Sequence, residues 1–333
     1  MKFHFSLALS LALLASFAVA DSKQQIAEDL FKKAADHSGP LTAIKGPYRI
    51  QYKLIFYDSQ TGAVEGSYSR IWLSRHQWRR EVSMPEFSEV SVSDGPSTWI
   101  ERKPHLFEPS NVSRFLGSLE SSSSPRLNPN DLVSKVKEET KGPARMQCVE
   151  TRNPLAPPPI GDKSFCFDAT NGAIVRLKEA DLRTEFSDFE SGDGAVIARK
   201  VQQFRGKELV AEGQLITLSS QELPARGLLD HSANARQFSN CDGKVTPGKL
   251  IQHKNPEYPA VARMAHQEGT VQVYVVIDVD GKPKDIEIVR GASKLLNDAA
   301  LEAIRQWRYQ PYICDGIPVQ VESVVDTNFN LAH

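Results

Sequence analysis

Four cysteines carry the clearest chemistry in this chain of 333 residues: Cys148, Cys166, Cys241 and Cys314. An even number of cysteines behind an export signal favours two disulfides, while the absence of CxxC or clustered Cys/His spacing disfavours a metal site. Three pairings are possible. We favour Cys148–Cys166, because both lie on strands predicted to be neighbours, which leaves Cys241–Cys314 to tie an interdomain segment to the last domain. Four buried free thiols are the alternative.

The eight histidines offer no comparable pattern. The sequence has no HExxH, GxSxG, Walker A or GxGxxG motif. His253 and His266 flank a Tyr-Pro segment, but no cysteine or carboxylate cluster stands at ligand spacing from them. We therefore expect no enzymatic activity, no cofactor and no metal.

The export signal occupies residues 1–20. Lys2 precedes an apolar run from Leu7 to Val19, and small residues at Ala18 and Ala20 predict cleavage before Asp21. Cleavage would release a periplasmic or secreted protein. The apolar run is shorter than the roughly 20 residues of a typical spanning helix. An uncleaved signal, which would anchor the protein in the inner membrane, is the alternative.

Composition excludes several classes of partner. Lys and Arg number 40 against 41 Asp and Glu, so no excess of positive charge is available for nucleic acid or an anionic membrane. A hydrophobic content of 40% is typical of globular domains, and the length allows two of them.

The pattern along the chain predicts a mainly β protein. Helical spacing marks residues 23–36, and short strand-like runs separated by Gly, Pro, Ser or Asp follow from 48 to 218. Residues 112–119 and 131–139 are predicted as short helices between strands. We expect a β-rich domain over 21–218, built as a curved antiparallel sheet or half-barrel with a helix. A linker over 219–250 and a small α+β domain over 251–333 would follow.

The run SYSRIWLSRHQWRREVSMPEFSEVSVSDGPSTWI, with CVE and FCFDATNGAIVRL later, resembles the lipoprotein-carrier family of LolA and LolB. That resemblance covers about 45–218 and implies a half-open barrel that shelters a lipid or acyl ligand. Ile71, Trp78 and Val90 would then line or border an apolar cavity. A sheet domain with a dry core is the alternative.

The last eighty residues alternate clearly. Val271, Val273 and Val275 would share one strand face, Asp280-Gly281 is a hairpin turn signal, and a helical run ends at Trp307. A final strand presents Val319, Val321, Val325, Phe329 and Leu331 at odd positions. These patterns predict a helix, two strands, a second helix and a strand, with Trp307 in the core.

This segment resembles the C-terminal domain of the TonB family. The matching marks are Tyr258-Pro259, Glu268-Gly269, Asp278 with Gly281, Asp298-Ala299-Ala300, Trp307-Arg308 with Pro311, and Gly316. The resemblance implies a βαββαβ or αββαβ domain whose terminal strand pairs with a segment of an outer-membrane TonB-dependent receptor or another envelope protein. It also links the chain to TonB-dependent transport across the envelope.

The resemblance assigns partner binding to two segments of this chain, one between the Tyr-Pro and Glu-Gly marks and one on the terminal strand. The residues are Ala262, Arg263, Met264, Val324, Asp326 and Asn328. The second sheet face and the terminal edge would be available to a partner. Coverage of that edge by the N-terminal domain or by a second copy of the chain, a homodimer, is the alternative.

Two features depart from the TonB family. Its anchoring helix carries Ser and, four residues later, His, whereas here Ser16 is followed at that distance by Ala20. Its Pro-rich spacer is replaced by the β-rich domain. These departures favour a docking module over a complete energy transducer, and a carrier that uses this module for docking is the alternative function.

Overall fold

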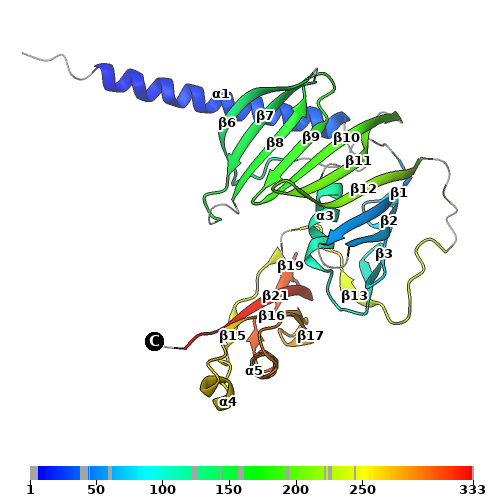
Figure 1. The fold of residues 1–333 in the computed structure, drawn as a ribbon, viewed down its shortest axis with the longest axis vertical. Coiled ribbons are helices and arrows are strands. Elements are labelled where there is room, and N and C mark those ends of the chain that lie inside the picture. Colours follow the sequence, from blue (N-terminus) through cyan, green and yellow to red (C-terminus); the bar gives the residue numbers. More distant parts are fainter. Residues whose placement is uncertain are drawn as a thin grey trace, which may run out of the picture. The chain divides into compact units, whose positions relative to one another are not determined.

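The computed structural model has a mainly β fold (Figure 1). It describes residues 7–331 apart from 38–43, 45, 59–61, 122–125, 143, 157–160, 193–194, 221–222, 224–226 and 244. Its largest sheet is open, antiparallel and thirteen-stranded, and three small sheets accompany it. The predicted fold class, an extended antiparallel sheet followed by a small α+β domain, is confirmed.

The chain divides into two compact units that do not follow the chain order. Unit 1 comprises Met1–Ile71 and Ser110–Leu223, and unit 2 comprises Trp72–Pro109 and Pro224–His333. The boundaries predicted from the sequence, at 218 and 250, remain a prediction.

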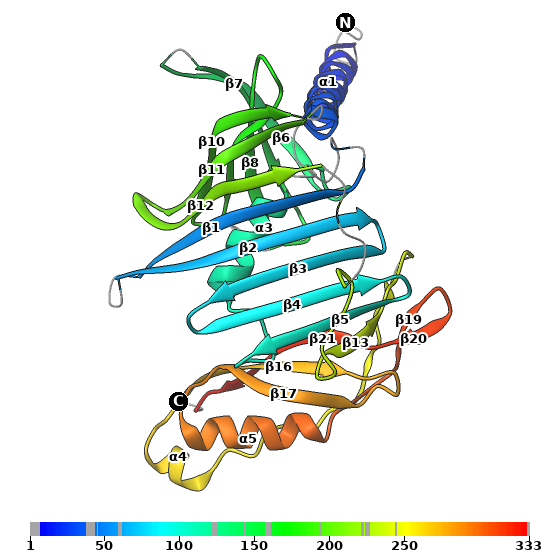
Figure 2. The same ribbon diagram turned by 90° about the vertical axis from the view of Figure 1, so that its right-hand side faces the viewer.

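Unit 1 contains two helices and nine of the thirteen strands of the large sheet, except that the end of one strand, Trp72–Ser74, belongs to unit 2 (Figure 2). In sheet order its strands are β2 (Gly62–Ser74), β1 (Tyr48–Asp58), β12 (Glu208–Ser219), β11 (Ala195–Arg205), β10 (Leu182–Gly192), β9 (Ile174–Glu179), β8 (Asp162–Asp168), β7 (Ala144–Arg152) and β6 (Leu132–Lys141). The helices are α1 (Leu7–His37) and α3 (Ser110–Ser121). The helix predicted over 23–36 lies within α1, and that over 112–119 lies within α3.

Strand register separates the two faces of this sheet. Phe31 of α1 packs edge-on against Phe165 and Phe167 of β8, and Phe115 of α3 packs against Phe56 of β1. Side chains alternate along a strand, so the neighbours of Phe165 at positions 164 and 166 point to the opposite face. Here one face of the sheet is therefore apolar and covered by helices, and the other carries the even-numbered residues of β7 and β8 together with Arg176 and Lys178 of β9.

Unit 2 contains the remaining strands. Four belong to the large sheet: β3 (Gln77–Met84), β4 (Phe87–Asp94), β5 (Ser97–Lys103) and β13 (Arg236–Ser239). A three-stranded sheet has the order β17 (Pro283–Arg290), β16 (Gly269–Ile277), β21 (Val321–Phe329). A second three-stranded sheet has the order β14 (Val245–Thr246), β19 (Tyr312–Cys314), β20 (Ile317–Val319), and a two-stranded sheet is formed by β15 (Leu250–Gln252) and β18 (Arg308–Tyr309).

The C-terminal part of unit 2 has the predicted element order. Helix α4 (Ala260–Met264) precedes β16, the Asp280-Gly281 turn joins β16 to β17, and α5 (Lys294–Arg305) precedes β21. Ser293 caps α5 by accepting a hydrogen bond from the backbone N–H of Leu296. Val271 and Val273 face the helices, and Trp307 is buried with them in one core, as predicted.

Two predicted elements differ from the structure. Residues 131–139 form strand β6, not a helix, because this segment completes a ladder with β7 from Leu132↔Arg152 to Lys141↔Ala144. The predicted linker, 219–250, contains strands β13 and β14, which pair with β5 and β19, and ends at the first residue of β15, which pairs with β18. In both cases, pairing with strands distant in the sequence outweighed a weak local sequence pattern.

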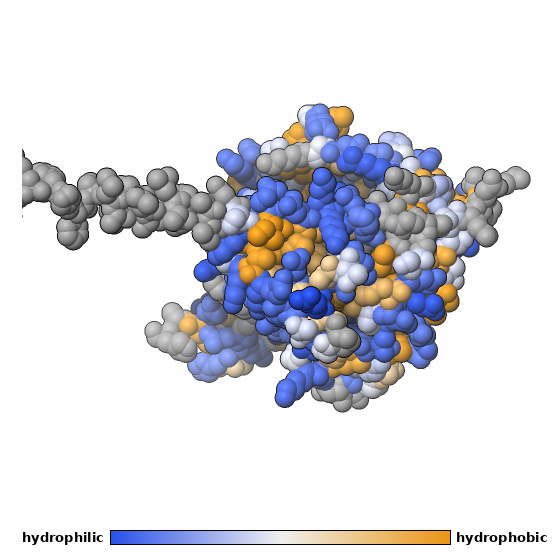
Figure 3. All heavy atoms as spheres, turned by 90° about the horizontal axis from the view of Figure 1, so that it is seen from above, coloured by the Kyte–Doolittle hydropathy of each residue, from blue (hydrophilic) through white to orange (hydrophobic). Residues whose placement is uncertain are grey.

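The structure contains the disulfides Cys148–Cys166, between the adjacent strands β7 and β8, and Cys241–Cys314. Both pairings are the favoured ones. Within the described residues, no helix combines the length and apolar character that a membrane crossing requires. The face of the molecule shown in Figure 3 is largely hydrophilic, with separate hydrophobic patches.

Candidate functional site

The outer edge of β21 is the candidate docking site. On one side β21 pairs with β16 over nine consecutive positions, from Val321↔Ile277 to Phe329↔Gly269. On the other side no strand in the described part of the chain pairs with it. An edge strand of this kind presents a row of backbone N–H and C=O groups to an extended partner.

Side-chain contacts hold β21 against β16 and keep that edge in order. Asn328 accepts a hydrogen bond from Thr270 at 2.6 Å, and Asp326 accepts one from Gln272 at 3.1 Å. Beyond the strand, the backbone N–H of Leu331 donates to the Glu268 carboxylate at 2.5 Å. Glu268, which the family resemblance marks, therefore fixes the end of the edge strand.

The other marked residues build the support beneath the edge. Trp307 is 6% exposed and donates its indole N–H to the Lys254 carbonyl at 2.9 Å. Tyr258 packs edge-on against Phe329 of β21. Gly281 has φ 77°, and a Cβ there would lie 2.0 Å from the Tyr309 carbonyl oxygen. Glycine is therefore required at this turn.

The predicted binding residues of α4 occupy different environments. Ala262 is fully buried in the core, so its side chain is not available to a partner. Arg263 is exposed and lies over the ring of Tyr258, 5.6 Å from its centroid, while Met264 is 75% exposed. On β21, Val324, Asp326 and Asn328 are all exposed. The structure thus places five of the six side chains at the surface.

The second face of the C-terminal sheet is not as open as expected. Tyr274 of β16 is only 3% exposed. Its hydroxyl donates to Glu322 at 2.5 Å and accepts from Arg236 at 2.6 Å, and Arg102 donates to the same Glu322 carboxylate at 2.7 Å. Glu287 of β17 accepts from the backbone N–H of Leu106 at 2.7 Å. The segment after β5 therefore covers part of this face, whereas no described strand pairs with the outer edge of β21.

Glu89 anchors that contact from within unit 2. Its side chain is completely buried, accepts from Arg102 at 2.6 Å and from Ser91 at 2.7 Å, and pairs with Arg80. Burial alone would raise the pKa of Glu89, but the charges and hydrogen bonds of these neighbours outweigh it and hold the pKa below its usual range. Sequence reasoning missed this network, because charges on a strand ordinarily indicate a solvated face.

The predicted cavity residues are dispersed. Ile71 is buried in unit 1, whereas Trp78 and Val90 are half-buried in unit 2. None of the three lines the pocket around Lys137 and Arg176 or the smaller pocket around Arg145 and Asp168. Their role in binding an apolar ligand remains a prediction.

Residues 254–331 match the family model described as the Gram-negative bacterial TonB protein C-terminal. The TonB protein of Vibrio cholerae is 33% identical over 86 residues, which are 26% of this chain and 35% of that protein. The tonB2 protein of Pseudomonas aeruginosa is 35% identical over 62 residues, which are 18% of this chain and 23% of that protein. The chain thus spans about a third or less of these curated relatives.

A LolA superfamily protein from Nitrosomonas europaea is similar over 61% of this chain and 96% of its own, with 11% identity and a TM-score of 0.41. The sequence match, the element order and the core agree over the C-terminal segment. Residues 254–331 of this chain are therefore a TonB C-terminal domain.

Proposed function

We propose that the TonB C-terminal domain of this chain binds an extended segment of an envelope protein by strand addition along the outer edge of β21. A TonB-dependent outer-membrane receptor is the first partner to test. The observation that carries the proposal is the edge strand itself, which is ladder-paired on one side only within the described residues and held by three hydrogen bonds beyond the ladder.

Backbone groups would supply most of the affinity in this arrangement, and the side chains of Arg263, Met264 and Val324 would adjust specificity. An ordered edge binds an extended segment with less loss of conformational freedom than a mobile one. Two disulfides suit an oxidising compartment such as the periplasm, where the N-terminal signal would direct the chain. Docking of this kind would link the protein to TonB-dependent transport across the envelope.

Proline substitutions in β21 test the mechanism. N–H groups alternate between β16 and the outer edge, so Asn328→Pro and Thr327→Pro remove one donor of each kind. The variant that loses the donor to β16 should fold poorly, and the variant that loses the outward donor should retain the native circular dichroism. The folded variant should bind a receptor segment at least tenfold more weakly, whereas Thr327→Ala and Asn328→Ala should lower the affinity by less than about threefold.

The opposite edge strand offers a matched control. Val289 lies in a bulge of β17, between the paired residues Ile288 and Arg290, so Val289→Pro should preserve both folding and binding. Equal affinities of the folded proline and alanine variants, or no binding of the unaltered protein to any outer-membrane receptor segment, would refute strand addition.

The alternative function is transport of an apolar or lipid ligand by the β-rich domain, with the TonB domain as a docking module. It requires saturable binding of a fatty-acyl probe to the delipidated protein, weakened by Trp78→Ala or Val90→Ala. Non-saturable uptake would exclude this function.

A further inference from the structure

The disulfide Cys148–Cys166 lies in the middle of a row of four residues on four adjacent strands. Register places Lys137 of β6 opposite Cys148, Cys148 opposite Cys166, and Cys166 opposite Arg176 of β9. Directly opposed residues project to the same sheet face with Cβ atoms about 5 Å apart. The disulfide is thus flanked by a basic residue on each side.

Arg176 contacts both sulfur atoms. Its Nη2 lies 2.9 Å from Sγ of Cys166 and 3.6 Å from Sγ of Cys148. Glu139 fixes the guanidinium at 2.5 Å and is itself bound by Lys137 at 3.0 Å. The hydrogen bond from Arg176, followed by that from Lys137, lowers the pKa of Glu139, which therefore stays charged and keeps the guanidinium in place.

The second disulfide has the opposite surroundings. At Cys241–Cys314, the sulfur of Cys314 lies 3.7 Å from a carboxylate oxygen of Asp315, and the sulfur of Cys241 lies 3.3 Å from the Gly243 carbonyl oxygen. A cation stabilises a thiolate, whereas a carboxylate destabilises one. Reduction should therefore be favoured at the first disulfide and opposed at the second.

We propose that Cys148–Cys166 is a thiol–disulfide exchange site for a small anionic thiol, with Cys166 as the leaving group. The incoming thiolate attacks Sγ of Cys148, the bond between the two cysteine sulfurs breaks, and Cys166 leaves as a thiolate beside Arg176. A second thiolate then attacks the sulfur of the bound thiol and releases the oxidised thiol as its disulfide. Cys148 departs as a thiolate that takes a proton from water, so two thiols are oxidised while one disulfide is reduced.

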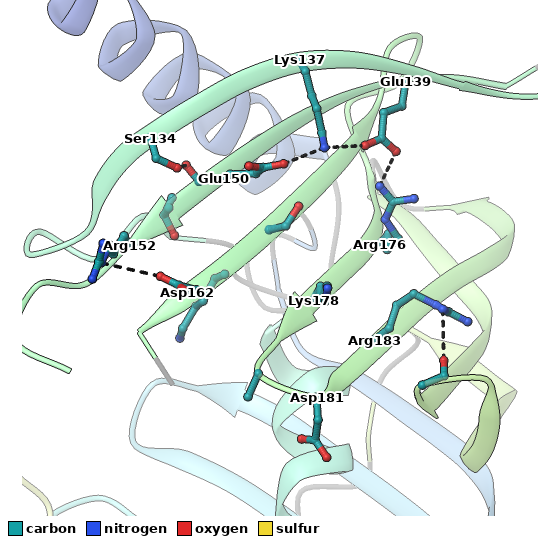
Figure 4. Close-up of a pocket in the computed structure, with 15 residues that line it drawn as sticks. Ser134, Lys137, Glu139, Glu150, Arg152, Asp162, Arg176, Lys178, Asp181 and Arg183 are labelled. Atoms are coloured by element: carbon teal, nitrogen blue, oxygen red, sulfur yellow. Dashed lines mark hydrogen bonds and ion pairs between the residues drawn. The ribbon is translucent and has the colours of Figure 1, made fainter. Parts of the chain in front are cut away.

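A pocket lies next to the site (Figure 4). It has a volume of about 820 Å³, and both Glu139 and Arg176 line it. Figure 4 shows Lys137, Glu139 and Arg176 linked in a chain across the strands. The sulfurs themselves are buried, but the side chains of Arg176 and Glu139 are 24% and 28% exposed, so their rotation would open the way. Basic side chains outnumber acidic ones among the lining residues, which suits an anionic thiol.

Redox titration of the full-length protein in glutathione buffers, with alkylation and peptide mapping, tests the proposal. Cys148–Cys166 should become half reduced under conditions at least tenfold less reducing than Cys241–Cys314. A trapped mixed disulfide should carry glutathione on Cys148. Arg176→Gln should make Cys148–Cys166 about tenfold harder to reduce, and Arg176→Lys should restore part of the difference.

Two variants serve as controls. Arg205→Gln breaks an exposed ion pair with Asp181 in the same unit and should leave both midpoints unchanged. Asp315→Asn should ease reduction of Cys241–Cys314 alone, and asparagine tolerates the φ of 49° at this position. Equal midpoints for the two disulfides, an Arg176→Gln variant that titrates like the unaltered protein, or reduction of Cys148–Cys166 only after loss of the native circular dichroism would each overturn the proposal.

Discussion

Glu89 shows how a single charged residue can hold distant parts of the chain together. It has no access to solvent, yet it pairs with Arg80 and Arg102, and Arg102 reaches on to Glu322 of the terminal strand. Removal of one member of a buried ionic group leaves part of the opposite charge uncompensated, which costs more than the group gains when complete. The carboxylate is therefore expected to be essential for unit 2 rather than for the remainder of the protein.

Glu89→Gln should lower the free energy of unfolding of unit 2 by about 3–5 kcal/mol at pH 7. The folded-state pKa of Glu89 lies below its unfolded value. Its contribution is thus complete above the unfolded-state pKa of about 4.3 and is lost as the pH falls through the folded-state value. The difference between the two proteins should shrink in acid. Denaturant unfolding at pH 7 and near pH 3 measures it, and a difference that does not depend on pH would contradict the ionic explanation.

At this scale, sequence reasoning succeeded where alternation decides the direction of a side chain. The odd-numbered residues of β21 face inward, and Val324, Asp326 and Asn328 face outward. Sequence reasoning was less successful for Ala262, which was predicted to bind a partner but is buried. A five-residue helix is too short for its sequence to show which side is buried. Sequence reasoning could not find the row around Cys148, since register between strands is set by tertiary pairing.

At the scale of elements, α5 and Trp307 support the sheet whose edge would dock. The indole is buried, and its ring contacts His253 at 4.9 Å between centroids. Its N–H donates a hydrogen bond to the Lys254 carbonyl, which links the segment before α4 to the end of α5. The order of helices and strands in this domain was predictable because the apolar residues of each element are strongly periodic. Strand β6 was mistaken for a helix because its residues do not alternate regularly between buried and exposed positions.

Trp307→Ala should unfold or severely weaken the TonB domain, with a loss of about 3–5 kcal/mol. Trp307→Phe retains most of the apolar contact but leaves the Lys254 carbonyl without its donor, and should cost about 1–3 kcal/mol. Denaturant unfolding followed by the remaining tryptophans measures both. A Trp307→Ala variant as stable as the unaltered protein would show that the ring does not support the domain.

At the scale of the whole molecule, the two units offer separate reporters. All four tryptophans, Trp72, Trp78, Trp99 and Trp307, belong to unit 2. The disulfide Cys148–Cys166 belongs to unit 1 and Cys241–Cys314 to unit 2, with sequence separations of 18 and 73. Tryptophan fluorescence therefore follows unit 2 alone, whereas far-ultraviolet circular dichroism follows both units. Nothing in the sequence pattern predicted that strands β3–β5 would group with residues from 224 onward.

The loss of stability caused by removing each disulfide should thus be reported by a different spectroscopic signal. By the chain-entropy model, Cys241→Ala with Cys314→Ala should cost about 4 kcal/mol, and Cys148→Ala with Cys166→Ala about 3 kcal/mol. The first pair should shift the fluorescence transition to lower denaturant. The second should leave that transition in place and shift only the part of the circular dichroism signal that belongs to unit 1. A fluorescence transition lowered equally by both pairs would mean that the two units unfold as one, and the assignment of each disulfide to the stability of its own unit would fail.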